Sequence, residues 1–267
     1  MSVITLLSDF GSKDPYVAEM KAVILSINSE ASVVDITHEV DKFNIRMGAF
    51  ILASATPYFP PNTVHVAVVD PGVGTKRRSI IVETKRGFYV GPDNGLLMLA
   101  AQKEGIIKVY HIDNPKYMLS RVSRTFHGRD IFAPAAAHLA AGTGPSEFGP
   151  AIQDYVFPEF VKPQAREGEV VGEVLHIDDF GNIVSNISVE DLQSEGFHKG
   201  DSLLVRLGDK TLILQFCSAY GEVPDGTALA LVGSSDFIEV ALNQGSASKT
   251  FKAEVGEPFR ISGAASN

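Results

Sequence analysis

The sequence predicts two domains of different fold class: an amino-terminal α/β domain and a smaller carboxy-terminal all-β barrel. Over residues 1–156, apolar runs typical of buried strands alternate with stretches at helical spacing. This is the pattern of a Rossmann-like, mostly parallel sheet with helices on both faces. Over residues 170–267 only short strand-like runs occur, separated by Gly, Asp, Asn and Pro turns. The segment 157–169, with two prolines and mixed charges, is the predicted linker.

The elements of the first domain follow in chain order. Each predicted strand is a short apolar run, and each predicted helix has apolar residues three or four positions apart. Asp14 is the predicted N-cap of the first helix, with Pro15 at its first helical position. Strands are predicted at residues 3–10, 32–37, 63–70, 79–85, 87–91 and 106–112, and helices after Asp14 and at 45–56, 96–104 and about 129–141.

The strand-like runs of the second domain are short and regularly spaced, which is typical of a small barrel. The first of them contains an Asp-Asp-Phe-Gly-Asn turn and therefore reads as a hairpin. The predicted strands lie within residues 168–187, 202–207, 211–216, 227–233 and 237–242.

Composition excludes several function classes. The formal net charge of -9 argues against a nucleic-acid partner bound through a broad basic face. No apolar run reaches the ~20 residues of a membrane-spanning helix, and no secretory leader precedes the first strand, so we expect no membrane partner. Cys217 is the only cysteine, which excludes an intrachain disulfide and favours a cytoplasmic protein. We expect its side chain to be a small buried hydrophobe.

The segment from Val66 to Ile80 is the clearest candidate site. An apolar run ends at Asp70, and a turn containing Gly72 and Gly74 leads to Arg77. A carboxylate at the carboxyl end of a buried strand, followed by a glycine-rich loop, is where open α/β sheets bind ligands.

Three further polar features have both a structural and a functional interpretation. Asp9 can bind a ribose diol at a strand end or can cap a turn. His127 can hold a proton for transfer or can form a structural hydrogen bond to the backbone. Arg129 and Asp130, which follow it, favour an ion pair or a helix cap. The Asp- and Asn-rich turn within residues 176–187 can be an ordinary hairpin. Metal-ligand spacings, phosphate-binding loops and dinucleotide motifs are absent, so no metal or cofactor is expected.

Taken together, seven segments in order closely resemble the S-adenosylmethionine hydroxide adenosyltransferase family, which is related to adenosyl fluorinase and chlorinase. The resemblance spans nearly the whole chain. It rests on LSDFG at 7–11, VVDITHEV at 33–40, VVDPGVGTKRR at 68–78, VGPDNGLL at 90–97, TFHGRD at 125–130, DDFGNIVSNI at 178–187 and GSS at 233–235.

The resemblance implies a homotrimer with substrate sites at subunit interfaces, and the substrate it implies is S-adenosylmethionine. It also implies a water-activating set of Asp70, Arg77 and His127, and a ribose-binding role for Asp9. The methionine and adenine contacts and the aromatic walls fall, by the same resemblance, on Phe43, Asp178 or Asp179, Asn182, Tyr220, Ser234, Ser235, Glu239 and Asn243.

The implied reaction is an SN2 attack of water or hydroxide on the ribose 5′ carbon, which gives adenosine and L-methionine without a metal. The halogenating relatives carry an aromatic hydroxyl residue in place of Asp70, and the fluorinase carries a serine in place of Gly128. A carboxylate repels a halide in a dry pocket but can orient a water, so Asp70 favours water as nucleophile. A halide-using adenosyltransferase and a non-catalytic sensor of S-adenosylmethionine or adenosine remain the alternatives.

Overall fold

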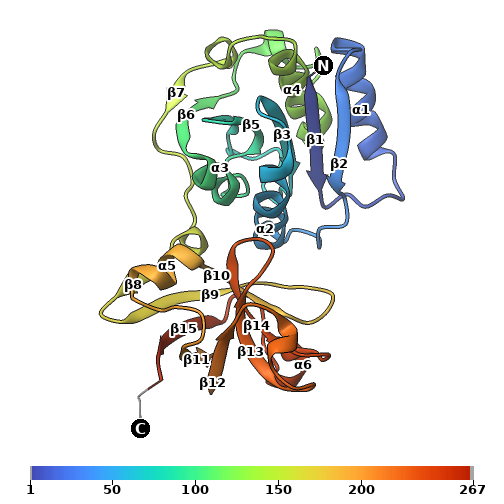
Figure 1. Cartoon of the computed structure of the whole chain (residues 1–267). Helices are drawn as coiled ribbons and strands as arrows, with labels where there is room; N and C mark the ends of the chain where they lie inside the picture. The colour runs from blue at the N-terminus through green and yellow to red at the C-terminus, as the bar shows by residue number, and fades with distance from the viewer. Residues whose placement is uncertain (1, 265–267) are drawn as a thin grey trace. The chain divides into compact units, whose positions relative to one another are not determined.

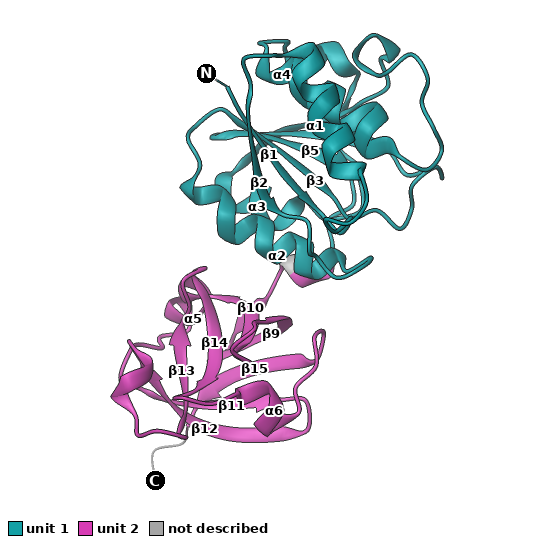
Figure 2. Cartoon of the chain, turned by 90° about the vertical axis from the view of Figure 1, so that its right-hand side faces the viewer, with its two compact units in different colours: residues 1–158 teal, residues 159–267 magenta. Residues whose placement is uncertain are grey.

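The computed structural model describes residues 2–264 and divides the chain into two compact units, Met1–Pro158 and Glu159–Asn267 (Figures 1 and 2). The first unit is an α/β sandwich and the second is a closed β-barrel, which confirms the predicted fold class. Within the segment 157–169, strand β8 (Gln164–Arg166) forms a hairpin with the first barrel strand.

The first unit is built on a seven-stranded sheet in the order β2-β1-β3-β5-β4-β6-β7. The strands β2, β1, β3 and β5 pair in parallel, whereas β4 is antiparallel to both β5 and β6. The sheet is therefore mostly parallel. Its strands are β1 (Val3–Ser8), β2 (Ser32–Thr37), β3 (Thr63–Val68), β4 (Ser79–Thr84), β5 (Gly87–Pro92), β6 (Ile106–His111) and β7 (Ala151–Ile152).

Helices cover both faces of this sheet (Figure 2). Helix α1 (Tyr16–Ile27) packs against α4 (Ala133–Ala140) on one face, and α2 (Ile45–Ala55) packs against α3 (Met98–Glu104) on the other. Every residue of the central strand β3 is buried, as expected for a parallel strand covered on both sides.

The predicted N-cap of α1 is wrong: the helix begins at Tyr16 with Pro15 as its N-cap, and no side chain caps it, so Asp14 lies one position too early. The helix predicted at about 129–141 is confirmed, but its first turn, Gly128–Phe132, is π-helical and α4 follows at Ala133. Single π-helical turns are common at functional sites, where they redirect side chains.

The chain order of the strands creates a crevice at one edge of the sheet. From β1 the chain passes to β2 on one side and then crosses to β3 on the other side of β1. Such a reversal separates the loops that follow the two strands, and ligands of open α/β sheets bind there. Asp9 follows β1 directly and Asp70 lies two residues beyond β3, so both carboxylates lie at this reversal.

The second unit closes seven strands into a barrel in the order β10-β14-β13-β12-β11-β15-β9, with β9 also pairing with β10. Only β12 and β13 pair in parallel. Cys217 is buried here, as predicted. The elements are β9 (Glu169–Ile177), β10 (Ile183–Ser188), α5 (Val189–Ser194), β11 (Ser202–Leu207), β12 (Lys210–Cys217), β13 (Ala228–Val232), β14 (Phe237–Leu242), α6 (Ala247–Phe251) and β15 (Pro258–Gly263).

Candidate active site

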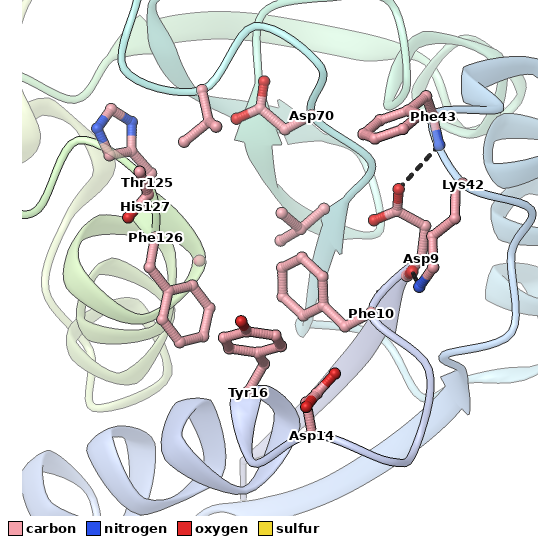
Figure 3. A pocket seen from close by; sticks show the side chains of 13 residues that line it. Asp9, Phe10, Asp14, Tyr16, Lys42, Phe43, Asp70, Thr125, Phe126 and His127 are labelled. Carbon is pink, nitrogen blue, oxygen red and sulfur yellow. Dashed lines mark hydrogen bonds between the residues drawn. The ribbon is translucent and has the colours of Figure 1, made fainter.

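A pocket of about 260 Å³ opens at the strand reversal of the first unit (Figure 3). We call it the first-unit pocket. Four sequence-predicted residues, Asp9, Phe43, Asp70 and His127, line it from four separate segments of the chain. Its complete lining is Asp9, Phe10, Asp14, Tyr16, Lys42, Phe43, Val68, Asp70, Val73, Thr125, Phe126, His127 and Gly128.

Asp9 is held at one side of this pocket by the segment that precedes α2. The backbone N–H of Phe43 donates to Asp9 Oδ2 at 2.9 Å, and the ammonium group of Lys42 donates to the Asp9 carbonyl (Figure 3). Phe43 has a φ of 65°, and this left-handed conformation turns its N–H toward the carboxylate. Because only one oxygen of Asp9 is bonded in this way, the other is available to a ligand hydroxyl.

Asp70 forms a two-point ion pair with Arg77 across the glycine-containing loop. Nε of Arg77 donates to Asp70 Oδ1 at 3.2 Å, and Nη2 donates to Oδ2. Both side chains are almost completely buried, with exposed fractions of 5% for Asp70 and 7% for Arg77. A bidentate pair of this kind fixes the plane of the carboxylate as well as its position.

The guanidinium group of Arg77 makes all of its hydrogen bonds to the protein. Nη1 donates to the Arg78 carbonyl and to Ser79 Oγ, each at 3.0 Å. Nη2 also donates to His127 Nδ1 at 3.0 Å. With the two bonds to Asp70, every N–H of the guanidinium is used, and Arg77 does not line the pocket. Arg77 therefore acts on a ligand through Asp70 and His127.

The contact with Arg77 also assigns the tautomer of His127. An arginine can only donate, so Nδ1 of His127 accepts and Nε2 carries the ring proton. Burial, and then the positive charge of Arg77, lower the pKa of His127 below its usual value, against opposing effects of Asp70 and Asp130. His127 is therefore a neutral imidazole at pH 7.

The turn that carries His127 is organised by Asp130, which is fully buried. Asp130 accepts from the Ser123 N–H at 2.8 Å and from Arg129 Nε at 2.7 Å. Burial raises the pKa of Asp130, but the hydrogen bonds from Arg129 and Ser123 outweigh it and lower the pKa overall. The expected ion pair between Arg129 and Asp130 is confirmed, and its role is to hold the loop around His127.

Sequence reasoning missed the aromatic floor of the first-unit pocket. The rings of Phe10, Tyr16 and Phe126 meet edge to face, with centroids 5.1 to 5.7 Å apart (Figure 3). Phe10 and Phe126 are chain neighbours of Asp9 and His127, and this adjacency was the available signal. Such an apolar surface lowers the local dielectric constant, which strengthens electrostatic interactions of the polar groups beside it.

The second unit contains its own pocket, of about 650 Å³, beside the turn between β9 and β10. We call it the second-unit pocket. Of the residues predicted from the sequence, Asp179, Asn182 and Tyr220 line it. Asp178 instead accepts from the backbone and the side-chain amide of Asn182, at 2.8 and 3.0 Å. The remaining lining residues are Phe180, Leu242, Gln244 and Gly245.

Glu239 lies behind the wall of the second-unit pocket and does not line it. The Tyr220 hydroxyl donates to Glu239 Oε1 at 2.5 Å. Burial raises the pKa of Glu239, the hydrogen bond from Tyr220 lowers it, and the charge of Asp178 raises it again. The net shift is upward. Glu239 therefore anchors the ring of Tyr220 from within the barrel.

The remaining predicted contacts do not line either pocket. Ser234 and Ser235 lie in the turn between β13 and β14, where Ser234 is exposed. Asn243 donates its side-chain amide to the Val223 carbonyl at 2.8 Å and to Asp225 at 3.3 Å. Those bonds tie the loop before β13 to the end of β14, so this side chain is engaged in holding the barrel.

Within residues 2–264, no three His, Cys, Asp or Glu side chains are grouped so that they could hold a metal ion. Among the helices of that same range, none combines the length and apolar character needed to cross a membrane.

Comparison with known protein families assigns the chain to one of them. Residues 4–149 match the model of the SAM hydroxide adenosyltransferase N-terminal domain, and residues 172–260 match that of its C-terminal domain. The chain belongs to the SAM hydroxide adenosyltransferase family. This membership confirms the resemblance found in the sequence motifs.

Individual relatives are similar in sequence to this chain over almost its full length. A Methanocaldococcus jannaschii protein named (R)-S-adenosyl-L-methionine hydrolase is 37% identical over 98% of this chain and 96% of its own length. A fluorinase from Actinopolyspora mzabensis is 31% identical over 97% and 96%. A crystal structure of an uncharacterized conserved protein from Thermotoga maritima is 39% identical, with a TM-score of 0.88 over 97% of this chain and 99% of that one.

Proposed function

We propose that this protein hydrolyses S-adenosyl-L-methionine to adenosine and L-methionine, and that its substrate is the (R) epimer at sulfur. The hydrolase name of its relatives supports the substrate. The single observation that carries the reaction type is that Asp70 and His127 line one pocket with Asp9 and are both hydrogen-bonded to the buried guanidinium of Arg77 behind its wall.

The chemistry of the substrate explains why this small set suffices. The leaving group of a sulfonium is a neutral thioether, so it needs no general acid. The difficult partner is water, which is a poor nucleophile because its pKa is ~15.7. The reaction therefore depends on orienting and activating one water molecule against the ribose 5′ carbon.

In the proposed step, a water oxygen bonds to the 5′ carbon while the carbon–sulfur bond breaks and its electron pair goes to sulfur. Asp70, fixed in plane by Arg77, accepts a hydrogen bond from the water and directs its lone pair. The water proton leaves to solvent, so the products are adenosine, methionine and one proton. Asp9 holds the ribose hydroxyls so that water, carbon and sulfur lie in line, which can contribute ~7–11 kcal/mol.

The fluorinase relatives make halide transfer the rival activity. The ion-paired carboxylate of Asp70 argues against it, because a halide beside it would be repelled in a buried, low-dielectric pocket. A site for chloride or fluoride needs hydrogen-bond donors, and here the donors of Arg77 are already used by the protein.

The proposal includes a cytoplasmic homotrimer that needs no cofactor, with substrate held between the first unit of one subunit and the second unit of its neighbour. Two exposed aromatic side chains support an assembly. Phe43 beside the first-unit pocket is 67% exposed, and Phe180 at the second-unit pocket is 82% exposed. Large exposed aromatic side chains at pockets are typical of surfaces that become covered.

The test is to incubate the purified protein with S-adenosylmethionine in water enriched in heavy oxygen. We expect adenosine carrying the heavy oxygen at its 5′ position, together with methionine. Adenosine without that label would exclude direct attack by water. Parallel reactions with chloride or fluoride test the rival activity, since a 5′-halogenated adenosine would establish it. Tight adenosine binding with no turnover would instead indicate a sensor.

A further inference from the structure

A series of side chains outside the pocket ends on the loop that carries Asp9. Ser8 Oγ, at the end of β1, lies 2.8 Å from His38 Nδ1, and Asp35 Oδ1 lies 3.1 Å from His38 Nε2. Lys21 of α1 donates to Asp35 Oδ2 at 2.6 Å. None of these four residues lines the first-unit pocket.

The direction of each hydrogen bond follows from the chemistry of the groups. Facing a carboxylate, Nε2 of His38 carries the ring proton, so Nδ1 accepts and the Ser8 hydroxyl donates. Ser8 Oγ itself accepts from the Phe10 N–H at 3.2 Å. The donors therefore point in one direction, from Phe10 through Ser8 to His38, and such serial bonds reinforce one another. Among the described residues, Nε2 of His38 has no hydrogen-bond partner, and it faces the Asp35 carboxylate as a 3.1 Å electrostatic contact.

Asp35 is a well-defined end to the series. Burial disfavours its charged form, but the hydrogen bond from Lys21 and the nearby Lys21 and His38 side chains outweigh burial and lower its pKa. Asp35 is therefore a carboxylate at pH 7 and fixes which nitrogen of His38 holds the proton.

The loop held by this series is the loop of Asp9. Asp9 lies between Ser8 and Phe10, so the Ser8–Phe10 bond forms a tight side-chain turn around it. The backbone carbonyl of His38 also accepts from the Gly11 N–H at 2.7 Å. His38 thus fixes the loop on both sides of Asp9, once through its ring and once through its backbone.

We infer that His38 is a positioning residue: through Ser8 it sets the orientation of the Asp9 carboxylate toward the ribose of the substrate. The inference rests on the proposed function, because it takes Asp9 as the ribose ligand. Ser8, His38 and Asp35 are not a nucleophilic triad. Ser8 is only 1% exposed, and its hydroxyl is engaged with both His38 and Phe10.

The same sheet provides a matched control. Thr5 Oγ1 lies 2.8 Å from His65 Nδ1, the same kind of bond at the same distance, three residues earlier on β1. This pair is buried, and the His65 ring packs against Tyr89 with centroids 4.9 Å apart. Neither Thr5 nor His65 lines the first-unit pocket. The Thr5→Val variant therefore removes a hydroxyl–imidazole bond without touching the Asp9 loop.

The experiment compares Ser8→Ala, His38→Leu, His38→Asn and Thr5→Val in the full chain, measuring adenosine affinity, kcat/KM for S-adenosylmethionine and thermal unfolding. Ser8→Ala and His38→Leu should lose about 10-fold or more in both affinity and kcat/KM, because a misplaced carboxylate loses its bonds to the ribose. His38→Asn, whose amide oxygen can accept from Ser8, should recover most of the loss. Thr5→Val should lower the unfolding temperature and leave both binding and kcat/KM unchanged.

A double-mutant cycle with Asp9→Asn separates positioning from general destabilisation. If His38 acts through Asp9, His38→Leu adds no further loss once Asp9 is replaced. Additive losses, or wild-type affinity in both Ser8→Ala and His38→Leu, would overturn the inference. Should His38→Leu fail to fold, Ser8→Ala and His38→Asn decide the question. A wild-type protein that neither binds adenosine nor releases it would refute the proposed function, and the inference with it.

Discussion

The two pockets differ in how their polar groups are buried. At the first-unit pocket, the side chain of Asp70 is 5% exposed and is bonded to Arg77, which is 7% exposed and also donates to His127. In the second-unit pocket, Tyr220 is 42% exposed and Phe180 is 82% exposed. A buried, pre-bonded cluster suits bond making and breaking, because its groups need not reorganise during reaction. Exposed walls suit recognition. Substitutions in the first pocket should therefore lower kcat, and those in the second should raise KM.

Replacing Arg77 should have the largest effect. Arg77→Ala leaves Asp70 buried without its partner, which typically costs about 3–5 kcal/mol of unfolding free energy. The substitution also removes the hydrogen bonds that fix the orientation of the Asp70 carboxylate and the tautomer of His127, so we expect kcat to fall ~10³-fold. Steady-state kinetics and denaturant unfolding measure the two effects. The exposed neighbour Lys76 provides the control, since Lys76→Ala should change neither.

Asp70→Asn should have the next largest effect. The amide keeps the size of the side chain but loses the charge that orients water, so kcat should fall by ~10²-fold or more. Adenosine affinity, measured by calorimetry, should remain within a few-fold of wild type because Asp9 is intact. Unchanged kcat would remove Asp70 from the reaction and, with it, the proposed contrast between the two pockets.

The pH dependence of activity should follow His127. Burial and the charge of Arg77 lower its pKa, so the neutral ring persists at pH values below the ordinary value of 6.5. Protonation would place a hydrogen on Nδ1 facing Arg77. We therefore expect kcat/KM to be constant from pH 6.5 to 8 and to fall at lower pH as His127 becomes charged.

The same shift has a consequence for stability. Between the lowered pKa of folded His127 and 6.5, the unfolded chain binds more protons, so the unfolding free energy should rise with pH through that interval. In His127→Gln, kcat should fall about 10²-fold, and the acidic limb of its kcat/KM profile should disappear. If the acidic fall in kcat/KM of the variant kept the same midpoint pH as in the wild type, that fall would belong to a group other than His127.

Tyr220→Phe should have the smallest effect and should act on KM. The variant keeps the ring but removes its 2.5 Å bond to Glu239, leaving the wall of the second-unit pocket less firmly held. We expect KM to rise about 3- to 10-fold with kcat nearly unchanged. Tyr58→Phe, at a tyrosine that is 79% exposed in the first unit, is the control. A larger loss in kcat than in KM would contradict the division of labour between the pockets.

The sequence placed the polar site residues near strand ends because periodicity and turn residues are local properties. Asp9 and Asp70 follow apolar strands, and parallel neighbours bring such ends to one edge. The sequence placed the start of α1 one residue too early, because Pro15 is itself the N-cap, its carbonyl accepts from the Glu19 N–H, and no side chain caps the helix. The sequence also did not show that Asp178 bonds the Asn182 amide while Asp179 lines the pocket, because both contacts depend on the folded turn.

By itself, the sequence determined the fold class and the family and nominated candidate site residues, since patterning and ordered motifs are local properties of the chain. Only the tertiary structure decided how those residues work. It showed that every guanidinium N–H of Arg77 donates to a protein group, and that neutral His127 accepts a hydrogen bond from Arg77. It also showed that His38 contacts the Asp9 loop through its hydrogen bond with Ser8. Hydrogen bonds, burial and protonation depend on groups that the fold brings together from distant positions, and no local pattern encodes them.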